Sequence, residues 1–309
     1  MRALIVGDVW PQAIRTDELA RRLGICDDSR PDLFVWTCDA SASGVPLRCQ
    51  RTILTFEPEV LRHMRIGANN LVVAASNHLN DTGPRAVAGL LESFKQHGFH
   101  YVGAGVNKTE TTMPPVLSTP AGPITFLAFA ETEPWVGAVP AELSAPGVWP
   151  YDEDKCVDAI SSAAQNSEYV WVYLHWGREF IRYPEPRQRR AARRFAEAGA
   201  TLVVASHTHV PLGWERIGKA YVFYGLGHFL FPNMRTEYGH TYRWDSVSRS
   251  GLALEGRSRD RHWAWTAKNI KLSAYGLPRI VGIAGRNVCP DYGEACYADL
   301  TAYEDMYPG

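Results

Sequence analysis

Short apolar runs alternate with amphipathic stretches over the first two-thirds of the chain. The runs are rich in Val, Ile, Leu and aromatic residues, which is typical of buried strands, and the stretches between them space their apolar residues as helices do. The expected strands are Ala3–Gly7, Leu33–Thr37, Asn70–Ala75, Tyr101–Gly103, Ile124–Ala130, Tyr169–His175, Thr201–Ser206 and Tyr221–Leu226. The expected helices are Asp17–Leu23, Glu57–Ile66, Pro84–Gly98, Asp152–Gln165 and Pro186–Ala198. This alternation predicts a layered α/β fold whose loops gather at the carboxyl ends of the strands.

The pattern changes after about residue 230. Gly251–Glu255, Trp263–Asn269 and Ile280–Gly282 have the composition of short strands in polar surroundings. No linker separates them from the rest, so we expect a single domain over residues 1–309. Its last part, residues 287–309, has little apolar periodicity and is expected to form a surface tail.

Composition excludes several classes of protein. The 32 basic and 33 acidic residues leave a net charge of −1, whereas a dedicated nucleic-acid binder carries surplus Lys and Arg. With 46% hydrophobic and 21% charged residues, the chain is an ordinary globular one and not a disordered one. No apolar run approaches the ~20 residues of a membrane-spanning helix, and the N-terminus lacks the apolar stretch of a signal peptide. We therefore expect a cytoplasmic protein with neither nucleic-acid nor membrane partners.

The six cysteines are scattered and form no CxxC pair. Reduced thiols in a cytoplasmic protein are the favoured interpretation, and a Cys289–Cys296 disulfide in the tail is the alternative.

Polar, metal-binding side chains follow one strand after another. In a mainly parallel sheet the carboxyl ends of the strands meet at one edge, so these side chains are expected to converge. They are Asp8, Asp39, Asn77, His78, His175, His207 and His209. Carboxylates, an amide and imidazoles are together the ligands of borderline divalent cations. The sequence therefore predicts a metal centre, with Asp39 suited to bridge two ions because its two oxygens can each bind one.

Five motifs resemble the CapA (poly-γ-glutamate capsule biosynthesis) family, a bacterial branch of the calcineurin-like metallophosphoesterases. The motifs are Gly7-Asp8, Ser76-Asn77-His78-x-x-Asp81-x-Gly83, His175-Trp176-Gly177, Ser206-His207-x-His209-Val210 and Tyr224-Gly225-Leu226-Gly227-His228-Phe229. The resemblance runs from about Met1 to about Pro278. It implies an α/β four-layer sandwich, in which two mixed β-sheets are flanked by helices and hold one or two divalent ions at their edge.

The resemblance also implies a role for each residue of the site. Asp8, Asp39 and His209 would hold one metal, and Asp39, Asn77, His175 and His207 the other. His78 would lie above the metals and protonate a leaving group or contact an oxyanion. Asp81 would either orient His78 or cap the following helix. The metal is Mn, Zn, Fe or Ca; the sequence does not choose among them.

The chain departs from the resembled pattern at three positions. Trp10 stands where the wider superfamily has a metal-binding histidine in Asp-x-His, so the first metal would lack a ligand. Asp39 replaces a longer glutamate, and Cys38 beside it is either a soft ligand or, as we favour, a buried thiol. His228 replaces an asparagine and would supply the missing ligand, act as a base, or simply form hydrogen bonds.

Three more residues near these motifs are expected to contact the site or the substrate. Arg178 and Glu179 directly follow the His-Trp-Gly motif, and Trp176, together with Trp10, would form an aromatic wall around the site.

Three functions are consistent with these residues. The first is a hydrolase in which activated water attacks a phosphoester or a peptide or γ-glutamyl bond. The second is a metal-dependent peptide epimerase of ribosomal peptide maturation, in which Asp8, His78 or His228 removes a Cα proton. The third is a non-catalytic accessory protein of polymer synthesis. The expected substrate is a small molecule, a peptide or a polyanion, and the oligomeric state stays open.

Overall fold

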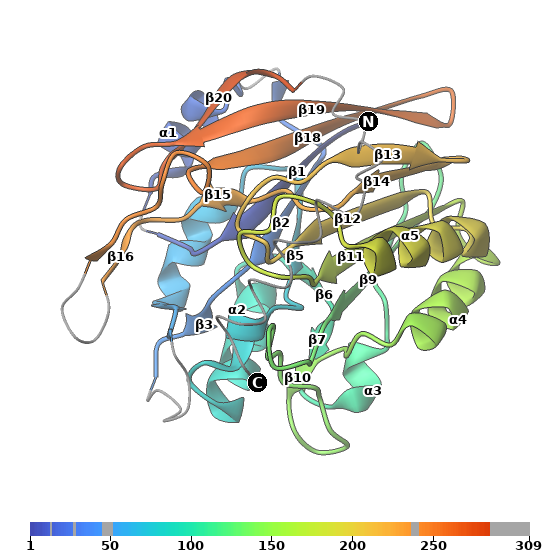
Figure 1. Ribbon diagram of the computed structural model, residues 1–309, viewed down its shortest axis with the longest axis horizontal. Coiled ribbons are helices and arrows are strands. Elements are labelled where there is room, and N and C mark those ends of the chain that lie inside the picture. The colour runs from blue at the N-terminus through green and yellow to red at the C-terminus, as the bar shows by residue number, and fades with distance from the viewer. Residues whose placement is uncertain (13, 27–28, 45–51, 236–240, 285–309) are drawn as a thin grey trace.

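Two β-sheets pack against each other, and helices cover their outer faces (Figure 1). The computed structural model describes residues 1–12, 14–26, 29–44, 52–235 and 241–284. The expected surface tail and the Cys289–Cys296 pair lie outside these residues. Within them Cys26, Cys38 and Cys156 are free thiols.

The first sheet has the strand order β20-β19-β18-β1-β2-β5-β6, with β15 also paired to β1. Strands β2, β5, β6 and β15 run parallel to their neighbours in this sheet, and β18 to β20 form an antiparallel extension beside β1. Their bounds are β1 Arg2–Val9, β2 Leu33–Cys38, β5 Asn69–Val73, β6 His100–Val102, β15 His228–Leu230, β18 Ser250–Arg259, β19 His262–Leu272 and β20 Pro278–Ile283.

The second sheet has the order β13-β14-β12-β11-β9-β8. Its four central strands are parallel, and β8 and β13 are antiparallel edges. The bounds are β8 Val116–Leu117, β9 Ile124–Ala130, β11 Tyr169–His175, β12 Leu202–Ser206, β13 Trp214–Ile217 and β14 Ala220–Phe223. In the described part of the chain, three strand pairs stand outside both sheets. They are β3 (Ser41–Ala42) with β4 (Thr55–Phe56), β7 (Ala104–Gly105) with β10 (Gly147–Val148), and β16 (Met234–Arg235) with β17 (Thr241–Tyr242).

The four longer α-helices begin and end close to where the sequence predicts, whereas the short helices α3 and η3 were not predicted. The α-helices are α1 Thr16–Arg22, α2 Pro84–Gln96, α3 Lys108–Thr111, α4 Glu153–Ala164 and α5 Pro186–Ala198, and the 3₁₀ helices are η2 Pro58–Met64 and η3 Asn77–Asn80. The segment expected as an α-helix over Glu57–Ile66 is therefore the tighter 3₁₀ form. Within the described part of the chain, no helix combines the length and the apolar character needed to cross a membrane.

Side-chain alternation along the strands builds the layers. In β11, Trp171 and Tyr173 belong to the core shared with the first sheet, whereas Val172 and Leu174 face α4 and α5. Trp171 packs edge-on against Trp263 and Trp265 of β19, with ring centroids 5.0 and 5.2 Å away, which joins the two sheets. The four-layer α/β sandwich with mixed sheets is thus confirmed.

The three strands near the C-terminal end differ most from expectation. The sequence predicts short, separate segments, but β18 and β19 pair along ten successive residue pairs, from Ser250 with Lys271 to Arg259 with His262. The hairpin turns through Asp260 and Arg261, both with positive φ (49° and 59°). Such turns usually carry Asn or Gly, so the Asp-Arg pair gives no indication of a hairpin.

Gly7 allows the first strand to approach the Leu226–Gly227 backbone. The Asp8 amide donates to the Gly227 carbonyl at 3.0 Å, and a Cβ placed on Gly7 would lie 2.0 Å from that same carbonyl oxygen. Because backbone cannot move aside as a flexible side chain can, position 7 tolerates no side chain, and the contact fixes Asp8 relative to His228.

Replacing Gly7 should therefore destabilise the protein. Gly7→Ala is expected to lower the free energy of unfolding by about 3 kcal/mol through overpacking. Gly89→Ala in α2, where a Cβ meets no atom within 4 Å, should instead raise it by about 0.5 kcal/mol. Urea unfolding followed by circular dichroism measures both. Equal stability of the two variants would contradict the steric argument.

Candidate metal centre

The carboxyl ends of strands from both sheets meet at one place. The first sheet supplies Asp8 from β1, Asp39 after β2 and Asn77 at the start of η3, which follows β5. The second sheet supplies His175, the last residue of β11, and His207 and His209, which follow β12. Strand β1 extends to Val9, so Asp8 lies within the strand and not after it. The structure therefore brings together residues that are far apart in the sequence.

The donors form two overlapping groups around Asp39. Ligand atoms of Asp8, Asp39 and His209 all lie within 4.8 Å of one another. On the other side, His175 Nε2 lies 3.6 Å from Asp39 Oδ1 and 2.8 Å from Asn77 Oδ1. Asp39 thus belongs to both groups, as a carboxylate that bridges two cations would.

Several buried atoms in this cluster have no hydrogen-bond partner among the residues that the structure describes. They are both ring nitrogens of His207 and Oδ2 of Asp39, and neither residue is exposed at all. The His207 ring lies 4.8 Å, centroid to centroid, from that of His175. A buried polar atom left unpaired costs about 1–3 kcal/mol, so each of these atoms needs a partner such as an ion, a ligand or a water molecule. The donor set therefore fits a divalent cation.

Both histidines of the His-x-His motif have a left-handed backbone conformation. His207 has φ 89° and His209 has φ 58°, a conformation that costs a residue with a side chain about 1–3 kcal/mol. In a regular strand, side chains two residues apart point to the same face. The structure instead places both residues in a bend beyond the end of β12, where the His207 amide donates to Asp8 Oδ2 at 3.3 Å.

The pKa values of the two carboxylates, Asp8 and Asp39, shift in opposite directions. Burial and the neighbouring Asp39 charge raise the pKa of Asp8 to about 7. Burial also opposes ionisation of Asp39, but the nearby His78, His175 and His209 outweigh it and lower the pKa of Asp39. Burial lowers the pKa of His175 well below its usual value, which keeps a lone pair available. A divalent cation would stabilise both carboxylates together.

Asp81 holds His78 in place. Its Oδ2 lies 2.7 Å from His78 Nδ1 and accepts the Leu54 amide at 2.7 Å. Burial would lower the pKa of His78, but Asp81 outweighs it and raises that pKa to about 9. Gly83 and not Asp81 precedes helix α2, so the capping alternative for Asp81 is wrong.

Two residues expected around the metal ligands, Cys38 and Trp176, lie in the hydrophobic core. The Cys38 thiol is buried in the core with its Sγ 3.5 Å from the Ala40 carbonyl, and burial raises its pKa, so it is a poor ligand. Trp176 belongs to the core under α4 and α5, because strand alternation sends it to the face opposite His175. The expectation that Trp176 forms a wall of the site is therefore wrong.

The Phe231 ring separates Trp10 from His209 and His228. Its indole donates to the Thr55 carbonyl at 2.8 Å and packs edge-on against Phe231 with ring centroids 6.0 Å apart. Phe231 in turn packs on His209 and His228. Trp10 therefore packs against these histidines indirectly, through Phe231.

The Glu179 side chain points toward the site, whereas Arg178 packs against Trp135. Glu179 Oε1 lies 3.7 Å from His209 Nε2, and the Arg178 guanidinium lies over the Trp135 ring, 5.6 Å from its centroid. The next residue, Phe180, has φ 63° and donates its amide to the Thr208 carbonyl at 2.8 Å. This strained hydrogen-bonded link fixes the position of Glu179.

Three supporting residues were missed by the sequence analysis. The Ser76 hydroxyl donates to Asp39 Oδ1 at 2.8 Å, and the Ser206 hydroxyl lies 3.2 Å from His175 Nδ1. Glu131, fully buried directly after β9, accepts the Gly177 amide at 2.9 Å and pairs with Arg187. Its place at a strand end, the criterion that identified the other acidic residues, would have revealed it.

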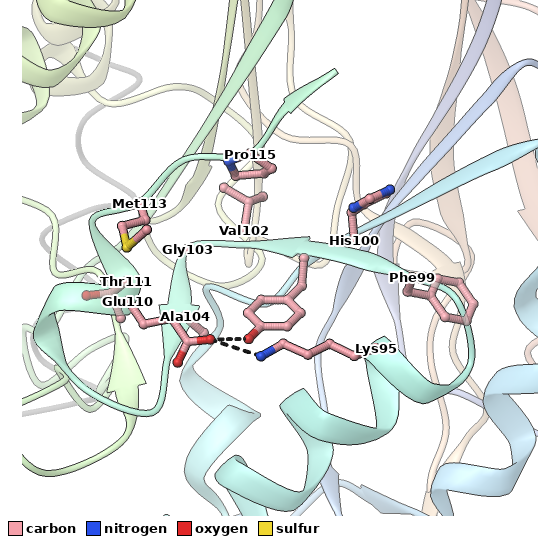
Figure 2. Close-up of a pocket in the computed structure, with 11 residues that line it drawn as sticks. Lys95, Phe99, His100, Val102, Gly103, Ala104, Glu110, Thr111, Met113 and Pro115 are labelled. Carbon is pink, nitrogen blue, oxygen red and sulfur yellow. Dashed lines mark hydrogen bonds and ion pairs between the residues drawn. The ribbon is translucent and has the colours of Figure 1, made fainter. Parts of the chain in front are cut away.

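A separate pocket beside β6 carries a different chemistry. Figure 2 shows Lys95 and Glu110 in it, with hydrogen bonds ending on the Glu110 carboxylate. The Tyr101 hydroxyl donates to Glu110 Oε1 at 2.6 Å, and Lys95 lies 3.2 Å from the same oxygen. These polar groups satisfy one another, so we place the functional site at the strand ends.

The two packed β-sheets and the buried carboxylate–imidazole cluster at their strand ends define an α/β sandwich protein with a candidate metal centre. The family described as bacterial capsule synthesis protein PGA_cap matches residues 32–233. The chain belongs to this family, as the CapA-like motifs predicted.

Two curated relatives are biosynthesis proteins named CapA. The chain is 28% identical over 182 residues to the capsule biosynthesis protein CapA of Bacillus anthracis, a match that covers 58% of this chain and 44% of the relative. It is 31% identical over 173 residues to the PGA biosynthesis protein CapA of Bacillus subtilis (strain 168), with 56% and 44% covered. The match thus spans less than half the length of either relative.

A solved structure has a similar fold. A hypothetical protein from Thermus thermophilus superposes with a TM-score of 0.52 at 17% identity, covering 88% of this chain and 99% of that one.

Asp39 should be the residue on which metal binding depends most. Asp39→Asn is expected to weaken binding of Mn²⁺ or Co²⁺ by on the order of 100-fold or more, because the bridging charge is lost from both donor groups. Isothermal titration calorimetry of the metal-free protein measures this. The exposed Asp158→Asn variant in α4 is the control. Equal affinities of the two variants would contradict the proposed centre.

Proposed function

We propose that the protein is a metal-dependent hydrolase acting on a phosphoester or on a peptide or γ-glutamyl bond. One observation carries the proposal. Asp39 lies between Asp8 and His209 on one side and His175 and Asn77 on the other, with the unpaired His207 nitrogens beside them. Donors on both sides of a shared carboxylate would suit a pair of divalent cations.

The protein's own residues prepare the site for hydrolysis. A bound pair of divalent cations supplies a water nucleophile at neutral pH and stabilises charge that develops on the substrate. Asp81 holds Nδ1 of His78, so Nε2 is the ring nitrogen that can give a proton to the leaving group. Ser76 and Ser206 orient Asp39 and His175, which limits reorganisation during the reaction.

The names of the relatives and the rim of the site suggest the kind of substrate. The curated relatives are named for the biosynthesis of a capsule and of PGA, which points to an anionic polymer or a precursor of one. Next to Glu179 in the sequence, the Arg178 guanidinium lies over the ring of the exposed Trp135. A cation next to an aromatic face suits an anionic chain with an apolar backbone.

Hydrolysis can be tested with two chromogenic substrates. With Mn²⁺ present, the protein should cleave bis(4-nitrophenyl) phosphate or γ-glutamyl 4-nitroanilide, and His207→Ala should lower kcat/KM by on the order of 100-fold or more. His262→Ala, at an exposed position in β19, serves as the control and should leave the rate unchanged.

Absence of turnover above the His207→Ala background on both substrates would refute the hydrolase proposal. Peptides incubated in heavy water distinguish the main alternative. Deuterium uptake at Cα without chain cleavage would establish peptide epimerisation in place of hydrolysis.

His78 and Asp81 should affect the chemical step more than binding. His78→Ala is expected to lower kcat by about 10²- to 10⁴-fold with a smaller change in KM, as for loss of a general acid. Asp81→Asn should lower kcat by about 10-fold, because the ring stays but loses its orienting charge. Steady-state kinetics on the cleaved substrate measure both. A change confined to KM would show that His78 only binds substrate.

A further inference from the structure

His228 lies directly beside Asp8 on the neighbouring strand. Strands β1 and β15 are parallel, and Asp8 and His228 are partners in their register. Residues opposite one another on paired strands point to the same face of the sheet. The close approach at Gly7 and Gly227 fixes this register. The backbone therefore brings the His228 imidazole to one of the candidate metal ligands.

The hydrogen bond of His228 Nδ1 leaves the lone pair of Nε2 facing the site. His228 Nδ1 lies 2.8 Å from the Ser248 carbonyl oxygen, which can only accept, so Nδ1 carries the proton. Nε2 is then unprotonated in the neutral ring. Metal-binding histidines usually donate their other ring nitrogen to a carbonyl or carboxylate in this way.

Packing holds the His228 ring in one orientation. The residue is fully buried, and Phe231 stacks on it with centroids 4.1 Å apart and an interplanar angle of 12°. Trp244 packs against its edge at 4.7 Å. A ring enclosed by aromatic side chains cannot turn its nitrogen elsewhere without disturbing the core.

The donors on the Asp8 side of the cluster point toward one another. His228 Nε2 lies 2.8 Å from His209 Nδ1, and Asp8 Oδ2 lies 3.7 Å from that same nitrogen. The other nitrogen of His209, Nε2, faces Glu179 Oε1 at 3.7 Å. Each of the two histidines thus has one nitrogen on the Asp8 side and the other facing an acceptor, Ser248 or Glu179.

We infer that His228 is a metal ligand, binding through Nε2 the cation that Asp8, Asp39 and His209 hold. The inference rests on the metal centre of the proposed function and adds a ligand to it. It also gives Ser248 and Glu179 a role, because they fix which nitrogen of each histidine faces the cation. The resulting set of two carboxylates and two imidazoles suits Zn²⁺, Mn²⁺ or Fe²⁺.

Metal binding to His228→Asn tests the inference. Equilibrium dialysis of the whole chain against Co²⁺, followed by elemental analysis and the visible absorption spectrum, gives the stoichiometry, the affinity and the ligand field. His228→Asn should weaken one site by on the order of 100-fold or more and change its d–d bands. The control is His100→Asn, an exposed residue of β6. An unchanged stoichiometry, affinity and spectrum would overturn the inference and leave His228 as a hydrogen-bond partner of His209.

A second measurement uses the unaltered protein and does not depend on how the variant folds. In ¹⁵N-histidine-labelled protein, Zn²⁺ should shift the Nε2 resonance of His228 while Nδ1 keeps its proton, which the Ser248 carbonyl protects from exchange. If Zn²⁺ shifts other histidines and leaves His228 unmoved, the inference fails and the metal centre stands. If the unaltered protein binds neither Zn²⁺ nor Co²⁺, the inference and the proposed function both fail.

Discussion

The mutual repulsion of two buried carboxylates, Asp8 and Asp39, is the constraint on which the candidate site depends. Neither side chain is exposed to water, and the charge of Asp39, together with burial, raises the pKa of Asp8 to about 7. In a medium of low dielectric constant such a pair requires compensating positive charge. The surrounding imidazoles supply part of it to Asp39, and a divalent cation would supply it to both carboxylates. The metal-dependent hydrolysis proposed for the protein follows from this requirement of both carboxylates for positive charge.

The scaffold is strained where it serves the site and well packed elsewhere. His207, His209 and Phe180 all adopt left-handed backbone, and each contributes or positions a group of the cluster. Away from the site, the two sheets meet through stacked and edge-on tryptophans, and alternation along each strand separates the layers. Stability gained in the core thus offsets strain and unpaired polar atoms at the strand ends.

Much of the site was predictable because parallel strands deliver their last residues to one edge. That rule identified Asp39, Asn77 and His175, and applied to β9 it would have added Glu131. The same alternation shows why Trp176 was misplaced, since the residue after His175 faces the opposite side of the sheet. The β18–β19 hairpin was underestimated because its Asp-Arg turn lacks the residues that usually mark one.

The order of the long helices and central strands and the layered fold class follow from the sequence, because hydrophobic periodicity is a local property, and residue type marks the candidate donors. The tertiary structure decided which atoms meet. Whether Nδ1 or Nε2 of His228 faces His209 depends on the Ser248 carbonyl, 20 residues away, and on the register of β15 against β1 at the other end of the chain. Ring orientation and tautomer are set by such long-range contacts, which no local pattern of residues encodes.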